Sequence, residues 1–125
     1  MKNKDTANIE VKNLIKDAYY NSKKHGFWED VDVNKLRPFF KNKGGILNIQ
    51  DVNSLSNRLM LITGEVSEAH EALRKKDYEN FKEELADIIL RVSDLAGGLD
   101  IDLEEELKKK MEKNKNRPYK HGKEF

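Results

Sequence analysis

The chain has 125 residues, which suits a single domain over residues 1–125 and is too short for two. Charged residues make up 38% and hydrophobic residues 37%, a balance too apolar for a disordered tail and too polar for a large core, so we expect helix faces to associate between chains. The net charge of +1 favours neither a nucleic-acid polymer nor a membrane as partner. The sequence has no cysteine and no apolar run near the roughly 20 residues that a membrane helix needs, which indicates a cytoplasmic protein.

The N-terminal part of the chain is predicted to hold one helix and an aromatic loop. Apolar residues recur at helical spacing over about residues 6–24, and Gly26 ends the pattern. From residue 27 to residue 50 the periodicity lapses, and Pro38 interrupts it, which predicts a loop with at most a short helical turn. Four aromatic residues gather in this loop, namely Phe27, Trp28, Phe39 and Phe40.

Two long helices are predicted next, from about residue 53 to 76, with Asn53 or Ser54 as cap, and from the cap Asp77 to the glycines at 97 and 98. Each helix carries an apolar seam in which residues recur at alternating three- and four-residue steps. The seams consist of Leu59, Ile62, Val66, Ala69 and Leu73 in the first helix and Phe81, Leu85, Ile88, Val92 and Leu95 in the second.

Two pairs of carboxylates hold the same position relative to these seams. The pairs are Glu65 with Glu68 and Glu84 with Asp87. Each acid directly precedes a seam residue, so all four project from one flank, and antiparallel packing of the two helices would gather them. Four carboxylates in one partly buried place repel one another unless a cation compensates them. The pattern therefore predicts a divalent metal bound through oxygen, with Mg²⁺ as the expected ion and Mn²⁺ as an alternative.

The last predicted helix starts at Asp102, which forms a capping-box-like pair with Glu105, and continues to residue 117. One face of it begins apolar and becomes cationic toward its C-terminal end; it comprises Leu103, Leu107, Lys110, Asn114 and Arg117. Lysine and arginine neutralise phosphate charge, so this face is a candidate phosphate-binding surface. Cations are also favoured near any helix C-terminus, which is the simpler explanation for the lysines.

Three segments resemble the MazG-like all-α nucleoside triphosphate pyrophosphohydrolases, whose motif is two Glu residues three apart followed by Glu-x-x-Asp. The segments are residues 64–68, residues 84–87 and Lys110-x-x-x-Asn114-x-x-Arg117-Pro118, within a likeness that covers about residues 55–122. The Gly-Glu opening at Gly64 looks like the dCTP pyrophosphatase type, because many MazG-type members carry a second Glu there. The resemblance implies Mg²⁺-dependent cleavage between the α- and β-phosphates of a nucleotide, giving a nucleoside monophosphate and pyrophosphate in nucleotide-pool house-cleaning.

We therefore expect an all-α, MazG-like four-helix bundle built by oligomerisation as a homodimer or homotetramer. Its parts would be an N-terminal helix and aromatic loop in residues 1–50, catalytic helices in residues 51–117 and a tail in residues 118–125. Glu65 and Glu68 are expected to bind metal and activate water, and Glu84 and Asp87 to bind metal. The expected substrate contacts are Lys110, Asn114 and Arg117 on the phosphates and Trp28 stacked on the nucleobase.

Other functions stay open at this point. The helices would also suit a non-catalytic interaction module whose seams form a bundle with another chain. A relative of the same fold that acts on dUTP or phosphoribosyl-ATP is a further alternative. A ferritin-like di-iron bundle is excluded, because it needs Glu-x-x-His and Ser67 stands three residues before His70.

Overall fold

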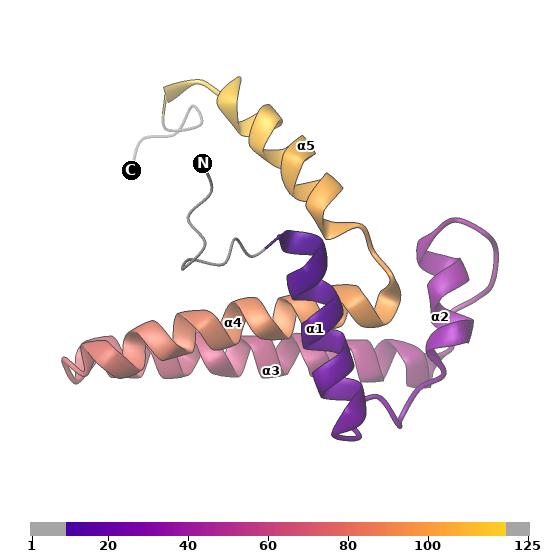
Figure 1. Ribbon diagram of the computed structural model, residues 1–125, viewed down its shortest axis with the longest axis horizontal. Helices are drawn as coiled ribbons and strands as arrows, with labels where there is room; N and C mark the ends of the chain where they lie inside the picture. The colour runs from indigo at the N-terminus through magenta and orange to yellow at the C-terminus, as the bar shows by residue number, and fades with distance from the viewer. Residues whose placement is uncertain (1–9, 120–125) are drawn as a thin grey trace.

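The computed structural model describes residues 10–119, and this part of the chain folds into five α-helices without a β-strand. The prediction of an all-α fold is thus confirmed (Figure 1). The helices are α1 (Val11–Lys24), α2 (Val33–Phe40), α3 (Ile49–Arg74), α4 (Tyr78–Leu99) and α5 (Leu103–Lys115). No helix among residues 10–119 is long and apolar enough to cross a membrane.

The two longest helices, α3 and α4, lie side by side as an antiparallel hairpin (Figure 1). Helix α1 crosses this hairpin and packs on α4, and α2 packs on the same helix near its C-terminal end. Helix α5 leaves the end of α4 and contacts α1 (Figure 1). The fold is therefore a helical hairpin with one crossing helix, and α5 is its least covered element because none of its residues is buried.

Helix α3 begins four residues earlier than predicted, at Ile49, because Asn48 and Asp51 form a capping box. The Asn48 side chain accepts from the Asp51 amide at 2.8 Å, and the Asp51 carboxylate accepts from the Asn48 amide at 3.1 Å. Asp51 is buried and also pairs with the Lys35 ammonium at 2.9 Å. Asn53 and Ser54, the two residues predicted as alternative caps, instead lie inside the helix. Asp77 and Asp102, by contrast, cap α4 and α5 as predicted.

The segment predicted as a loop contains a helix, α2, which ends with the second aromatic pair, Phe39 and Phe40. Asp32 caps this helix, and Leu36 is completely buried. Arg37 on the next position donates from Nε to the Gly98 carbonyl at 3.0 Å, which ties α2 to the C-terminal end of α4. Eight residues with an internal proline are too few to display helical periodicity in the sequence, so tertiary packing decides this element.

Gly97 and Gly98 do not end α4, as the sequence predicts, but lie within its last turn. A Cβ atom on Gly97 would lie 2.5 Å from the Tyr19 Cβ, and one on Gly98 would lie 2.1 Å from the Trp28 indole. The two glycines therefore allow α1 and the following turn to approach the α4 backbone closely. The helix ends one residue after them, at Leu99, because Asp100 adopts the left-handed conformation with φ of 54°.

Gly98→Ala is expected to lower the free energy of unfolding by about 3 kcal/mol, the upper end of the range for overpacking, because neither the helix backbone nor the indole can move aside. Gly64→Ala is the matched control: Gly64 is also helical, and a methyl group added there would have nothing within 4 Å. It should stabilise the protein by up to about 1 kcal/mol. Urea denaturation at one protein concentration measures both, and equal stability of the two variants would contradict the close packing.

The predicted apolar seams are only partly covered within one chain. Ala69 is buried, but Leu59, Val66, Leu73 and Leu85 remain 53%, 48%, 48% and 47% exposed. Other residues are buried along the hairpin, including Ala72, Ala96 and the acid Glu84. Glu84 of the acidic flank is thus more deeply placed than these four seam residues, the reverse of what a lone soluble hairpin would favour.

Candidate functional site

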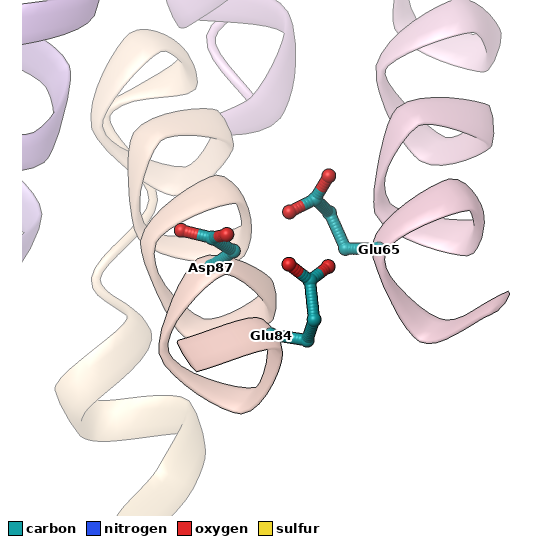
Figure 2. Close-up of side chains that lie close together, drawn as sticks. All are labelled: Glu65, Glu84 and Asp87. Atoms are coloured by element: carbon teal, nitrogen blue, oxygen red, sulfur yellow. The ribbon is translucent and has the colours of Figure 1, made fainter. Parts of the chain in front are cut away.

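Three of the four predicted acids converge between α3 and α4. Figure 2 shows the carboxylates of Glu65 from α3 and of Glu84 and Asp87 from α4 pointing toward one another. One oxygen from each lies within 4.8 Å of the others. The antiparallel hairpin produces this cluster, because it places the middle of α3 beside the first half of α4. We call Glu65, Glu84 and Asp87, with the adjoining Glu68, the acid cluster.

Glu84 is the innermost member of the acid cluster. Its side chain is buried, and its Oε2 atom has no hydrogen-bond partner among the described residues. A hydrogen bond with the Glu68 carboxyl, burial and the negative charges of the neighbouring acids together raise the pKa of Glu84 to about 7. Without a cation, Glu84 therefore keeps its proton to a higher pH than an ordinary glutamate does.

Glu65 occupies the side of the acid cluster that faces α4 and Arg91. Burial raises the pKa of Glu65, the Arg91 guanidinium opposes this effect, and the charges of Glu68 and Asp87 add to the increase. The Arg91 Nε lies 3.7 Å from the Glu65 Oε1. One arginine at this distance offsets only part of the negative charge of four acids, so the cluster retains an excess of anionic oxygens.

The donor set of the acid cluster fits a hard divalent cation. All its ligand atoms are carboxylate oxygens, which Mg²⁺ and Mn²⁺ prefer, whereas softer metals favour sulfur or imidazole nitrogen. The buried oxygen of Glu84 that lacks a donor is a position at which a cation would supply the missing partner. Glu68 is the most exposed of the four acids.

A cavity of about 680 Å³ adjoins the acid cluster, within the size range of small-molecule sites. Glu65 and Asp87 line one end of it. From there it extends along α3 toward Arg58, along α4 toward Asp94, and against the turn that contains Phe27. A ligand that reaches the cluster from this side would thus meet α1, α3, α4 and the turn after α1 together.

Trp28 lies in the interior beside this cavity and does not line it. Its indole donates to the Asp94 carboxylate at 2.8 Å, and the Arg58 guanidinium lies 3.9 Å from the ring centroid. The ring also packs on Gly98 and is only 5% exposed. Protein atoms therefore cover the indole, and this packing does not support the prediction that Trp28 stacks on a nucleobase. The neighbouring Phe27 lines the cavity and is 67% exposed.

Arg58 and Asp30 form a part of the cavity wall that sequence reasoning missed. Arg58 donates to both Asp30 carboxylate oxygens and to the Phe27 carbonyl, the last at 2.7 Å. The hydrogen bonds from Arg58 are the main reason that the pKa of Asp30 is lowered to about 2. The two residues belong to separate segments, and no spacing in the sequence relates them. Only the fold brings them together and fixes the turn after α1 to α3.

The predicted phosphate-binding face of α5 lies away from the acid cluster of the same chain. Lys110, Asn114 and Arg117 are exposed, and none of them lines the cavity beside the acid cluster. The left-handed residue Asp100 turns the chain after α4, so α5 runs away from the hairpin (Figure 1). The structure therefore brings Glu65, Glu84 and Asp87 together, with Glu68 adjoining them, but does not bring the α5 cations to them within a single chain.

Comparison with known families adds one finding. The family model of the MazG nucleotide pyrophosphohydrolase domain matches residues 53–121, more than half of the chain. The matched region contains α4, α5, most of α3 and all four acids. The turn that contains Phe27 and Asp30 precedes it, as does α1. No curated protein and no solved structure matches the chain.

Proposed function

Because the chain belongs to the MazG nucleotide pyrophosphohydrolase domain family, we propose that it is a Mg²⁺-dependent nucleoside triphosphate pyrophosphohydrolase. It would hydrolyse an NTP or dNTP at the α–β phosphate bond, releasing the monophosphate and pyrophosphate and so removing nucleotides from the pool. The observation that carries the proposal is the acid cluster, in which the buried Oε2 of Glu84 has no partner beside two further carboxylates.

Glu65, Glu84 and Asp87 are the residues that would hold the metal, with Glu68 adjoining them. The ion would neutralise charge on the phosphoryl oxygens of the substrate. More than one ion is compatible with four acids, since Mg²⁺ usually takes one or two carboxylates beside water and phosphate. The protein's contribution is to hold these carboxylates close together before the substrate arrives, which α3 and α4 achieve by packing.

Glu68 is the acid that we assign to the attacking water. It is exposed to solvent, and its carboxyl lies within hydrogen-bonding reach of Glu84. The water oxygen would form a bond to the α-phosphorus while the bond from that phosphorus to the bridging oxygen breaks. The water proton would pass to Glu68, and the electron pair of the broken bond would leave with pyrophosphate. Glu65 remains the alternative base, because it lines the cavity.

The cavity beside the acid cluster would receive the nucleoside. With the phosphates at the cluster, the base and sugar would extend toward Phe27 and Arg58. Phe27 is the exposed aromatic ring in this wall and offers a surface for stacking, which tolerates any base. Trp28 would act indirectly, because it supports Arg58 through the ring contact and holds Asp94 through its indole N–H.

The active assembly would be a homodimer or homotetramer. The exposed seam residues of α3 and α4 provide an apolar surface that a second copy would cover. Because α5 runs away from the acid cluster of its own chain, Lys110, Asn114 and Arg117 would contact the phosphates of a substrate held by another copy. Their exposure and the cationic end of their helix support this assignment.

A product analysis tests the proposal. The full chain is incubated with common NTPs and dNTPs, including dUTP, and with phosphoribosyl-ATP, with and without Mg²⁺, in water enriched in ¹⁸O. We expect monophosphate and pyrophosphate only with metal, and the ¹⁸O label in the monophosphate, because attack occurs at the α-phosphorus. Release of a nucleoside diphosphate and inorganic phosphate would contradict the proposed reaction.

The alternative of a non-catalytic helical interaction module makes a different prediction. In that case no substrate would be turned over, and neither Mg²⁺ nor nucleotide would raise the melting temperature. A ligand that binds the folded chain must raise it by mass action, so the same thermal measurement separates the two functions.

A further inference from the structure

We propose that Arg91 binds the α-phosphate of the substrate, the phosphate that carries the nucleoside. This inference rests on the proposed function and adds a substrate-binding residue to it. Arg91 is not part of any motif recognised in the sequence, and the structure alone places it in the wall of the cavity that would hold the nucleoside, next to Glu65 of the acid cluster.

The position of Arg91 on α4 is the first observation. Arg91 follows Asp87 by four residues and precedes Asp94 by three, so the three side chains lie on one face of the helix. All three line the cavity. Asp87 marks the end at the acid cluster, and Asp94 marks the end at the indole of Trp28. A nucleotide that lies along this face would place its first phosphate beside Arg91.

The second observation is that the Arg91 guanidinium is available. Among residues 10–119 its one polar contact is the 3.7 Å ion pair with Glu65, which is too long for a hydrogen bond. The side chain is 43% exposed. Arg58, the other arginine of the cavity, differs in both respects. It is 11% exposed and bonds to Asp30, Ser54 and the Phe27 carbonyl. Arg58 therefore builds the wall, whereas Arg91 has donors left for a ligand.

A bound cation would compete with Arg91 for Glu65, the single partner of its guanidinium among residues 10–119. Once Glu65 coordinates a cation, that carboxylate no longer balances the guanidinium, and Arg91 needs another anion. A phosphate is the natural replacement, because the planar guanidinium can donate two parallel hydrogen bonds to its oxygens. Arg91 would then bind the α-phosphate both in the triphosphate and in the monophosphate product, whereas pyrophosphate, which leaves from the other side of the α-phosphorus, would not touch it.

Binding of the two products separately tests this inference. Calorimetry in the presence of Mg²⁺ measures the Kd of pyrophosphate and of the nucleoside monophosphate that matches the best-hydrolysed triphosphate, chosen from the common ribo- and deoxyribonucleoside 5′-monophosphates. Arg91→Ala should raise the Kd of the monophosphate at least about tenfold, the loss expected for a hydrogen bond to a charged group, and leave the Kd of pyrophosphate unchanged. Arg91→Lys should give an intermediate value, because it keeps the charge and loses the second bond.

Lys82→Ala is the control, because Lys82 is also an exposed cation of α4 in an ion pair, with Glu79, and lies outside the cavity. It should change neither Kd. If wild-type protein hydrolyses the triphosphate but Arg91→Ala binds the monophosphate normally, or loses affinity for pyrophosphate instead, the assignment of Arg91 is wrong and the proposed function stands. If wild-type protein neither hydrolyses a triphosphate nor binds a monophosphate, the proposed function itself fails.

Discussion

Glu84→Gln is expected to reduce Mg²⁺-dependent hydrolysis by roughly 10²–10⁴-fold and, at the same time, to raise the melting temperature of the metal-free protein. The loss of activity follows because a neutral amide is a poor ligand for a hard cation, and a metal supplies several kcal/mol of transition-state stabilisation. The gain in stability follows because Glu84 is buried beside three other carboxylates. At a pH above about 7, where the Glu84 carboxyl is ionised, glutamine removes one negative charge from this group, and its amide can donate to Glu68.

Glu83→Gln is the matched control for this experiment. Glu83 precedes Glu84 on α4, carries the same charge and is exposed. It should leave activity and melting temperature unchanged. Addition of Mg²⁺ should stabilise wild-type protein and Glu83→Gln, but not Glu84→Gln. A Glu84→Gln protein that keeps its activity, or that is less stable than wild-type without metal, would contradict the assignment of the acid cluster as a cation site.

Ile89→Lys and Leu59→Lys are each expected to convert the proposed oligomer into a monomer, seen by light scattering as a fall in mass to that of one chain. Both positions lie on the hairpin and are more than half exposed in the single chain, at 54% and 53%. An unpaired ammonium group within an apolar interface costs several kcal/mol, enough to weaken association by roughly 100-fold or more. Activity should fall with the mass, because α5 would no longer reach the phosphates in another copy.

Ile46→Lys controls for the added charge, since Ile46 is an 82% exposed residue in the connection between α2 and α3. It should keep the mass and activity of wild-type protein. The assembly proposal fails if the wild-type chain is monomeric and fully active at low concentration. It also fails if both hairpin variants remain oligomeric.

The extent of the family match indicates which segment of the chain would determine the choice of substrate. The match begins at residue 53 and includes the acids, so the region shared with the family contains the chemistry that we propose. Much of the cavity wall is formed by residues before this point, including Phe27 and Asp30. We infer that the nucleoside preference of this chain depends on its N-terminal segment, and a substrate screen of Phe27→Ala would show whether the preference changes.

The four acids show which features of the site can be predicted from residue spacing alone. Their shared offset from two apolar seams predicted that antiparallel helices would gather them, and the structure brings the carboxylates of Glu65, Glu84 and Asp87 together. This works because the positions of side chains around a helix are set by the 3.6-residue period. The caps Asp77 and Asp102 were predictable for a similar reason, since a side chain that bonds its own backbone three residues on needs no distant partner.

The surroundings of the acids could not be predicted in this way. The glycines at 97 and 98 looked like a helix end but serve as a contact surface for Tyr19 and Trp28, and Trp28 is covered as a consequence. Helix α2 forms because Leu36 is buried and Arg37 bonds to the end of α4. In each case the deciding partner lies about 60 or more residues away along the chain, and periodicity carries no information about such contacts.

The all-α class, the family and the alignment of the acids along α3 and α4 follow from the sequence, because they depend on local propensity, motif spacing and helical period. The environment of those acids follows from the packing of the helices: the buried, unpartnered oxygen of Glu84, the cavity beside Asp87, the open guanidinium of Arg91 and the departure of α5. Burial, desolvation and the distance between charges exist only once the helices pack. These quantities determine whether four carboxylates form a solvated helix face or a cation site.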